Sequence, residues 1–222
     1  MSLTVKICGL STPEALDVAL DAGADMVGFV FFPPSPRNIS YKTASALEAR
    51  VRGQAQKVAL SVDADDTMLS YVVDALGPDI LQLHGNESPL RVAAIKARFK
   101  LPVMKAIAVE SKADLAAIAR YAAVADHLLF DARPPRDATR PGGLGNAFDW
   151  ALLEKLNPGV PFMVSGGLNA GNVGEALRLT RALGVDVSSG VERAPGQKDP
   201  DKIRAFIRAA RDAAAKQIDR VV

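Results

Sequence analysis

The stretch Val5-Lys6-Ile7-Cys8-Gly9 opens with the first of eight short apolar runs that recur along the chain. Each run is rich in Val, Ile, Leu or Phe, as expected of strands that are buried on both faces of a parallel sheet. A segment with helical patterning follows each run, so the chain reads as eight β-α units. The other runs are Met26–Phe32, Lys57–Val62, Ile80–His84, Val103–Val109, His127–Asp131, Phe162–Ser165 and Val185–Ser188.

Eight β-α units predict an α/β fold of the closed (βα)8 TIM-barrel type. With 222 residues the chain is compact for this fold, and no linker or change in composition divides it. We therefore expect a single domain over residues 1–222. The alternative, a doubly wound open sheet, normally has fewer strands and a switch point in its strand order.

Serine, threonine or aspartate followed by proline marks the start of several expected helices. A side-chain oxygen at the N-cap accepts a backbone N–H, and proline suits the first helical position. The three pairs are Thr12-Pro13, Ser88-Pro89 and Asp199-Pro200.

The overall composition excludes several classes of function. The 27 basic and 25 acidic side chains give a net charge of +2, which does not favour nucleic acid as a partner. A single cysteine cannot form an internal disulfide, and we see neither a secretory signal nor a membrane-spanning run. One Cys and two His make a protein-built metal site improbable. We expect a cytoplasmic enzyme.

Strand parity predicts where the polar side chains of these runs point. Alternate residues of a strand share a face, so Cys8, His84, Asp131 and Ser188 can all face the barrel interior. The opposite register would bury unpaired polar groups against the apolar helix layer, at a cost of about 1–3 kcal/mol each. The four side chains are therefore expected to converge at the carboxyl ends of the strands, where such barrels perform their chemistry.

Two glycine-serine turns follow the last two runs. They are Ser165-Gly166-Gly167-Leu168 and Ser188-Ser189-Gly190-Val191. Glycines allow the backbone to approach an anion closely, and loops after strands seven and eight commonly bind phosphate in this fold. Either turn alone could be only a tight turn, but together they favour a ligand with a phosphate monoester.

These segments resemble the phosphoribosylanthranilate isomerase family of tryptophan biosynthesis. The resemblance covers nearly the whole chain, in order, at the strand ends. The matching pieces are Lys6–Gly9, Gly28–Phe31, Ser35–Ser40, Gln82–Gly85, Leu129–Asp131, Gly142-Gly143, Phe148–Trp150, Ser165–Asn169 and Asp186–Glu192. The family performs an Amadori rearrangement of N-(5′-phosphoribosyl)anthranilate by acid–base catalysis without a cofactor.

The resemblance implies a role for each candidate residue. Cys8 matches the general base and Asp131 the general acid. Independently of the resemblance, Lys6 has the same parity as Cys8 and lies two residues before it, so it is a possible source of the cation that favours a thiolate. Arg37 matches the arginine that pairs with the anthranilate carboxylate. The other expected substrate-binding residues are His84, Asp186, Gly166, Gly167, Ser189 and Gly190.

Two segments depart from the family pattern, and several alternatives stay open. Leu144 stands where the family usually has Thr, and Leu60-Ser61-Val62-Asp63 is more polar than expected. A histidine-pathway isomerase would use two aspartates and a second phosphate site, and a metal-dependent epimerase would need more ligands than two His provide. A non-catalytic phosphate-binding barrel would not need Cys8 and Asp131. The sequence leaves monomer and homodimer equally open.

Overall fold

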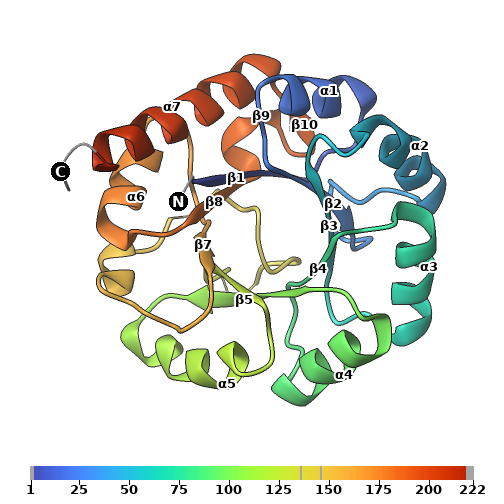
Figure 1. The fold of residues 1–222 in the computed structure, drawn as a ribbon, viewed down its shortest axis with the longest axis horizontal. Coiled ribbons are helices and arrows are strands. Elements are labelled where there is room, and N and C mark those ends of the chain that lie inside the picture. Colours follow the sequence, from blue (N-terminus) through green and yellow to red (C-terminus); the bar gives the residue numbers. More distant parts are fainter. Residues whose placement is uncertain (1–2, 136, 146, 219–222) are drawn as a thin grey trace.

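Eight parallel strands close into a barrel in chain order in the computed structural model, which describes residues 3–135, 137–145 and 147–218 (Figure 1). The predicted (βα)8 barrel is confirmed, and each strand begins and ends within one residue of the predicted run. The strands are β1 (Thr4–Cys8), β2 (Met26–Phe31), β3 (Gln56–Ser61), β4 (Ile80–Leu83), β5 (Val103–Val109), β6 (His127–Ala132), β7 (Phe162–Val164) and β8 (Gly184–Val187).

Seven α-helices among the described residues form the outer ring of the barrel (Figure 1). The three predicted N-caps are present: Thr12, Ser88 and Asp199 each accept a backbone N–H, at 3.3, 3.2 and 2.9 Å. The helices are α1 (Pro13–Asp21), α2 (Tyr41–Val51), α3 (Asp66–Leu76), α4 (Pro89–Phe99), α5 (Ile118–Ala122), α6 (Val173–Thr180) and α7 (Pro200–Ile218).

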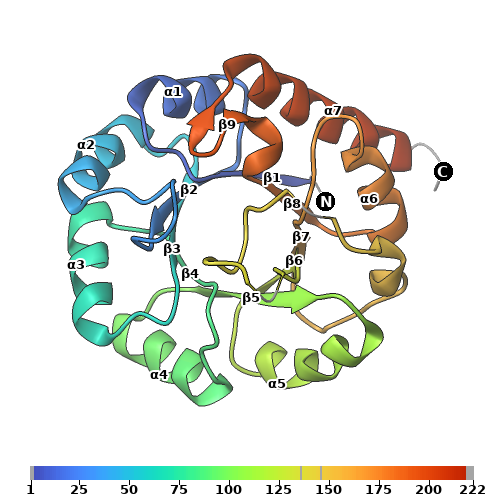
Figure 2. The same ribbon diagram turned by 180° about the vertical axis from the view of Figure 1, so that it is seen from behind.

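The expectation of a helix after every strand is wrong after β6. There the described residues form a long loop that ends in a single 3₁₀ turn, η2 (Trp150–Leu153). Prolines at 134, 135 and 141 lack the N–H that a helix needs, and Gly143 and Gly145 adopt φ values of 69° and 83°. Both views of the ribbon show the yellow loop inside the outline of the barrel (Figures 1 and 2).

A small hairpin after β8 was also missed. The chain passes from the 3₁₀ turn η3 (Ser189–Val191) into β9 (Glu192–Ala194) and β10 (Gln197–Lys198), which pair antiparallel before α7 begins. The strands are too short to show a period in the sequence. This hairpin lies beside the site that the carboxyl ends of the strands create.

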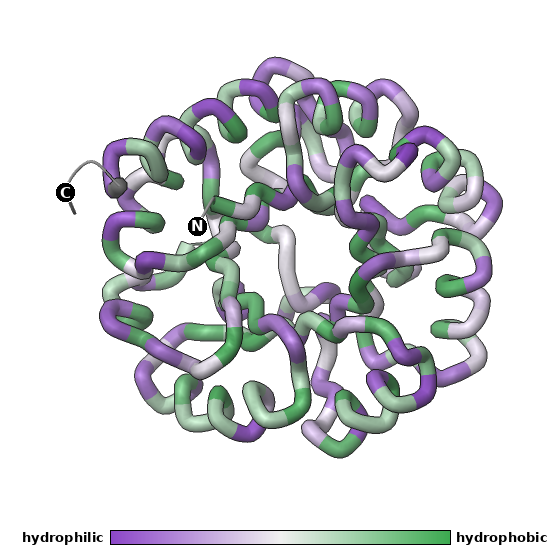
Figure 3. The backbone as a smooth tube through the Cα atoms, in the orientation of Figure 1, coloured by the Kyte–Doolittle hydropathy of each residue, from purple (hydrophilic) through white to green (hydrophobic). Residues whose placement is uncertain are grey.

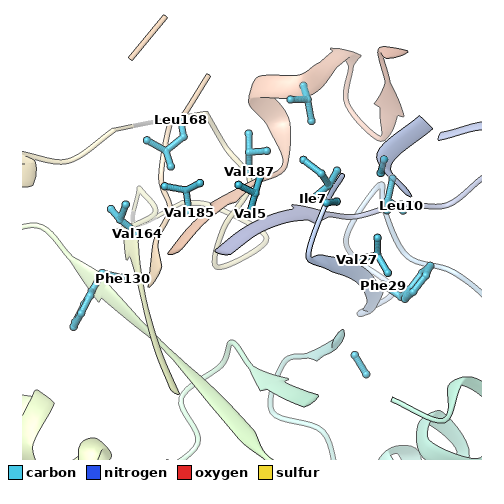
Figure 4. Close-up of a cluster of buried hydrophobic side chains, with 14 of the residues drawn as sticks. Val5, Ile7, Leu10, Val27, Phe29, Phe130, Val164, Leu168, Val185 and Val187 are labelled. Carbon is cyan, nitrogen blue, oxygen red and sulfur yellow. The ribbon is translucent and has the colours of Figure 1, made fainter. Parts of the chain in front are cut away.

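The core has two layers, separated by the wall of strands. The outer layer packs Val5, Ile7, Phe130 and Val185 against the helices, and Figure 4 shows part of this cluster. The hydropathy colouring shows many hydrophilic positions on the outer helix faces (Figure 3). The inner layer closes the barrel below the site, with Met26, Val58, Ile80, Met104, Ala106, Leu129 and Met163.

Helix α7 is amphipathic, as its sequence predicts. Ile203, Phe206, Ile207 and Ala210 are buried against the barrel. Removing the Phe206 ring would cost about 3–5 kcal/mol, as is usual for a buried aromatic side chain. In the part of the chain that the structure describes, no helix is long and apolar enough to cross a membrane.

Candidate active site

A cavity opens at the carboxyl ends of the strands and contains nearly all the candidate residues. Cys8, His84, Asp131 and Ser188 all line it, so the predicted inward register is correct. Arg37, Asp186, Gly166, Gly167 and Ser189 also line it. Gly190 is not among the lining residues and packs against the backbone of Leu168 instead.

Asp131 lies at the end of β6 and is only 6% exposed. Its Oδ1 accepts the N–H of Ala132 at 2.9 Å, and its Oδ2 lies 3.2 Å from His84 Nε2. The amide nitrogen of Gln82 lies 3.0 Å from the other ring nitrogen, His84 Nδ1. If the Gln82 amide donates this bond, the neutral imidazole carries its proton on Nε2, which faces Asp131.

Gln82 lies in β4 and His84 directly follows that strand, so the two share the inward parity; Gln82 contacts His84, and His84 contacts the carboxylate of Asp131. The sequence predicted His84 at the barrel mouth but not its contact with Asp131. That contact depends on the register of β4, β5 and β6, which parity alone cannot give.

Cys8 is 4% exposed and lies beside a fully buried ion pair. Lys6 Nζ is 2.9 Å from Asp186 Oδ1, and the two residues are direct register partners in β1 and β8. Burial raises the pKa of the Cys8 thiol, and the nearby Lys6 cation opposes this rise without cancelling it. Lys6 is therefore placed as expected, but burial has the larger effect on the thiol.

Asp186 was expected to bind sugar hydroxyls. It does line the cavity, but its Oδ1 is bonded to Lys6. Burial alone would lower the pKa of Lys6, but Asp186 and Cys8 outweigh burial and raise it. The ammonium of Lys6 is consequently held in its charged form inside the barrel.

Arg37 is buried, with 4% of its surface exposed, and its guanidinium is bound on one edge. Nε and Nη2 each donate to Glu192 at 2.7 Å, and Nη2 also donates to the carbonyl of Gly143 at 3.1 Å. Glu192 in turn binds Lys198 at 2.8 Å. Burial favours the neutral form of Glu192, but Arg37 and Lys198 outweigh it and lower the pKa of the carboxyl.

Glu192 and Lys198 are functional candidates that the sequence analysis missed. Glu192 belongs to a segment that carried the family resemblance, but its partner Arg37 is 155 residues away. Lys198 lies in β10 of the hairpin that was not predicted. The only signal in the sequence was that Glu192 directly follows the second glycine-serine turn.

The two glycine turns are in direct contact. A Cβ atom at Gly190 would lie 1.8 Å from the carbonyl oxygen of Leu168, so no side chain fits there. Gly166 and Gly167 have φ values of 81° and 64°, which favour glycine. The turns therefore form a continuous main-chain wall of the kind that binds phosphate.

The loop after β6 touches both sides of the cavity. A Cβ atom at Gly142 would lie 2.6 Å from Asp131 Oδ2, and one at Gly143 would lie 2.5 Å from Arg37 Nη1. Leu144, which departs from the family pattern, also lines the cavity. The absence of side chains at Gly142 and Gly143 thus allows the backbone to lie against the charged groups of the site.

The described residues hold no group of three His, Cys, Asp or Glu side chains that could bind a metal ion. The polar groups of the cavity are instead arranged as hydrogen-bonded pairs, which suits proton transfer and the binding of an anionic ligand.

The sequence model of the family described as N-(5'-phosphoribosyl)anthranilate (PRA) isomerase matches residues 5–209. The chain belongs to this family. Among members of the phosphoribosylanthranilate isomerase family, the protein of Nitrobacter winogradskyi is 68% identical over 96% of this chain and 95% of its own length. The protein of Bradyrhizobium diazoefficiens is 66% identical over 95% of each chain.

Solved structures of the phosphoribosylanthranilate isomerase family have the same fold. The Thermotoga maritima protein aligns with a TM-score of 0.85 and 34% identity, over 95% of this chain and 99% of its own. A second structure, with a TM-score of 0.82 and 32% identity over 95% of this chain and 99% of its own, contains reduced 1-(o-carboxyphenylamino)-1-deoxyribulose 5-phosphate. The family predicted from the sequence motifs is confirmed.

Proposed function

We propose that this chain isomerises N-(5′-phosphoribosyl)anthranilate to 1-(2-carboxyphenylamino)-1-deoxyribulose 5-phosphate in L-tryptophan biosynthesis. The observation that carries this proposal is that Cys8 and Asp131, from β1 and β6, line one cavity bounded by two glycine turns. The cavity can therefore hold a phosphorylated ligand between a thiol and a carboxyl group. Family membership and the high identity to named isomerases support the same reaction.

The proposed binding mode holds the substrate at its two anionic ends. Main-chain N–H groups around Gly166, Gly167 and Ser189 would bind the phosphate, with Gly190 supporting them from behind. Arg37 would bind the anthranilate carboxylate through Nη1, because Nε and Nη2 already donate to Glu192. Fixing both ends places the ribose across the barrel mouth.

Asp131 would begin the reaction as general acid. Its proton moves to the furanose ring oxygen, the bond between C1′ and that oxygen breaks, and the nitrogen lone pair forms a C1′=N iminium. His84 Nε2 lies 3.2 Å from the same carboxyl group and would keep it oriented toward the substrate. General acid catalysis of this kind contributes about 10²–10⁴-fold.

Cys8 would complete the rearrangement as general base. The thiolate removes the C2′ proton, the electron pair forms a C1′=C2′ bond, and the iminium nitrogen accepts the displaced electrons. The resulting enolamine loses its O2′ proton and gains a proton at C1′, which gives the ketone. The iminium of the substrate serves as electron sink, so these steps draw on acid and base alone.

The thiol also suggests where the enzyme works. A cysteine that acts as a base must stay reduced, and the cytoplasm maintains that state. We therefore propose a cytoplasmic enzyme. The cavity-lining residues come from one chain, so a monomer or a homodimer could each be active; one structural relative is described as dimeric.

The direct test is turnover of N-(5′-phosphoribosyl)anthranilate by the purified protein, together with rescue of a tryptophan auxotroph that lacks this isomerase. Cys8→Ser and Asp131→Asn should each lower turnover by about 10²–10⁴-fold without changing the thermal melt. Arg204→Ala, at an exposed position of α7, is the matched surface control.

Three outcomes would contradict the proposal. Near-normal turnover in either variant would remove that residue from the mechanism. A wild-type protein that binds inorganic phosphate without turning over the substrate would be a non-catalytic phosphate-binding barrel. Faster turnover of an aminoaldose phosphorylated at both ends would identify a histidine-pathway isomerase.

A further inference from the structure

We infer that Lys6 is a positioning residue for Cys8, and that its buried ammonium, anchored by Asp186 across the β1–β8 seam, is the counter-ion of the Cys8 thiolate. This inference rests on the proposed function, which requires Cys8 to act as a base. It deepens that function by assigning a task to a lysine and an aspartate that neither the acid nor the base step uses.

The first support is the absence of a side chain at Gly28, the register partner of Cys8 in β2. A Cβ atom at Gly28 would lie 3.0 Å from Cys8 Sγ and 3.2 Å from Lys6 Nζ. The thiol and the ammonium therefore meet in the space that a side chain at position 28 would fill. In this position the ammonium of Lys6 is close enough to Sγ to stabilise a negative charge on it.

The second support is the anchor of the ammonium. Lys6 is fully buried, and Asp186 Oδ1 lies 2.9 Å from its Nζ. Because β1 and β8 pair Lys6 directly with Asp186, the register of the barrel seam fixes where the ammonium lies. A lysine has a long flexible stem, and this pairing holds it in one place under the thiol.

The third support is the cost of burying this ion pair. A buried pair rarely stabilises a fold more than apolar residues of the same volume would. The interior residues around it are apolar, including Met26, which is the register partner of Lys6 in β2, as well as Val58 and Met163. The charges therefore stand on an otherwise apolar interior surface, two residues before Cys8 on the same face of β1, as expected if their purpose is chemical.

The other charged groups facing Cys8 leave Lys6 as its main counter-ion. Lys198 also favours the thiolate but is bonded to Glu192 and to the carbonyl of Ser188, while Asp186 opposes the thiolate. Burial raises the pKa of Cys8, and Lys6 is the strongest influence that lowers it. Without Lys6, a buried thiolate would lose the cation that stabilises it most.

The experiment titrates the single cysteine of the chain by the ultraviolet absorbance of its thiolate, with Cys8→Ser as blank. Asp186→Asn removes the opposing charge and should move the titration midpoint to lower pH. Lys6→Met, and the charge-free double variant Lys6→Met with Asp186→Asn, should move it to higher pH by about one unit or more. The double variant leaves no unpaired buried charge, so it remains informative if Lys6→Met does not fold.

Lys105 and Glu87 form a matched control, since they are an equally buried pair at 2.8 Å on the helix side of the sheet. Lys105→Met with Glu87→Gln should leave the midpoint unchanged. Shifts of opposite sign for Asp186→Asn and the double variant would support the inference, because a merely structural role would not produce them. An unchanged midpoint, or shifts in the same direction, would overturn it. Wild-type turnover tests the proposed function separately, so the two failures are distinguishable.

Discussion

His84 Nε2 lies 3.2 Å from Asp131 Oδ2, while Gln82 Nε2 lies 3.0 Å from His84 Nδ1. These two contacts connect Gln82 of β4, through His84, to Asp131 near the end of β6. A neutral imidazole that accepts at Nδ1 donates at Nε2, so Gln82 can decide which ring nitrogen serves the carboxyl group.

We expect His84→Ala to lower kcat by about 10- to 100-fold, the size of effect that follows loss of a hydrogen-bonded partner that orients a metal ligand. KM should change less, because His84 is not at either anionic end of the proposed binding mode. Gln82→Leu should act in the same direction with a smaller effect. Steady-state kinetics check this, and a rise in KM with unchanged kcat would show instead that His84 binds substrate.

Arg37→Ala should mainly raise KM. It removes the cation that is proposed to hold the anthranilate carboxylate, and one hydrogen bond between charged groups is worth about 1.5–3 kcal/mol. An analogue that lacks the carboxylate is the matched control, since wild type and variant should bind it alike. Equal weakening for both ligands would mean that Arg37 supports the fold rather than the carboxylate.

Glu192→Gln should destabilise the protein in a pH-dependent manner. The pKa of Glu192 is lowered in the folded state, because Arg37 and Lys198 outweigh its burial. A lowered pKa gives stability that is present above the ordinary glutamate range and is lost as pH falls through the folded value. The gap between the urea midpoints of wild type and variant should thus be large at neutral pH and close in acid.

The control for this titration is Glu48→Gln, which alters a half-exposed pair with Lys57. Surface pairs contribute about 0–1 kcal/mol, so its midpoint should stay near wild type at every pH. A gap for Glu192→Gln that is constant with pH would show that lost packing, rather than charge, explains its effect.

Gly190→Ala should separate the two glycine turns. The added methyl group would lie 1.8 Å from the Leu168 carbonyl oxygen, and such overpacking typically costs about 1–3 kcal/mol. Binding of inorganic phosphate should weaken with it, as measured by calorimetry. Gly174→Ala in α6 is the control, because its methyl group would meet only Ala213 at 3.5 Å.

The strands of this molecule were easier to predict from the sequence than its loops. Buried strands leave a clear apolar signature, and inward parity correctly placed Cys8, His84, Asp131 and Ser188 in one cavity. The loop after β6 was expected to lead into a helix, because a segment with helical patterning was expected after every strand. The ion pair between Arg37 and Glu192 joins residues 155 positions apart, and neither composition nor periodicity carries that information.

The position of Cys8 in the barrel has a consequence for how the protein loses activity. Lys6 and Asp186 join β1 to β8, and Ser188 Oγ donates to the Cys8 carbonyl at 3.1 Å across the same seam. The groups that hold the thiol are therefore the groups that close the ring of strands. If β1 and β8 separated transiently, the enzyme would lose activity while the remaining β-α units kept their structure. Mild denaturant should accordingly abolish turnover before it changes circular dichroism, and inactivation should serve as a sensitive reporter of barrel closure.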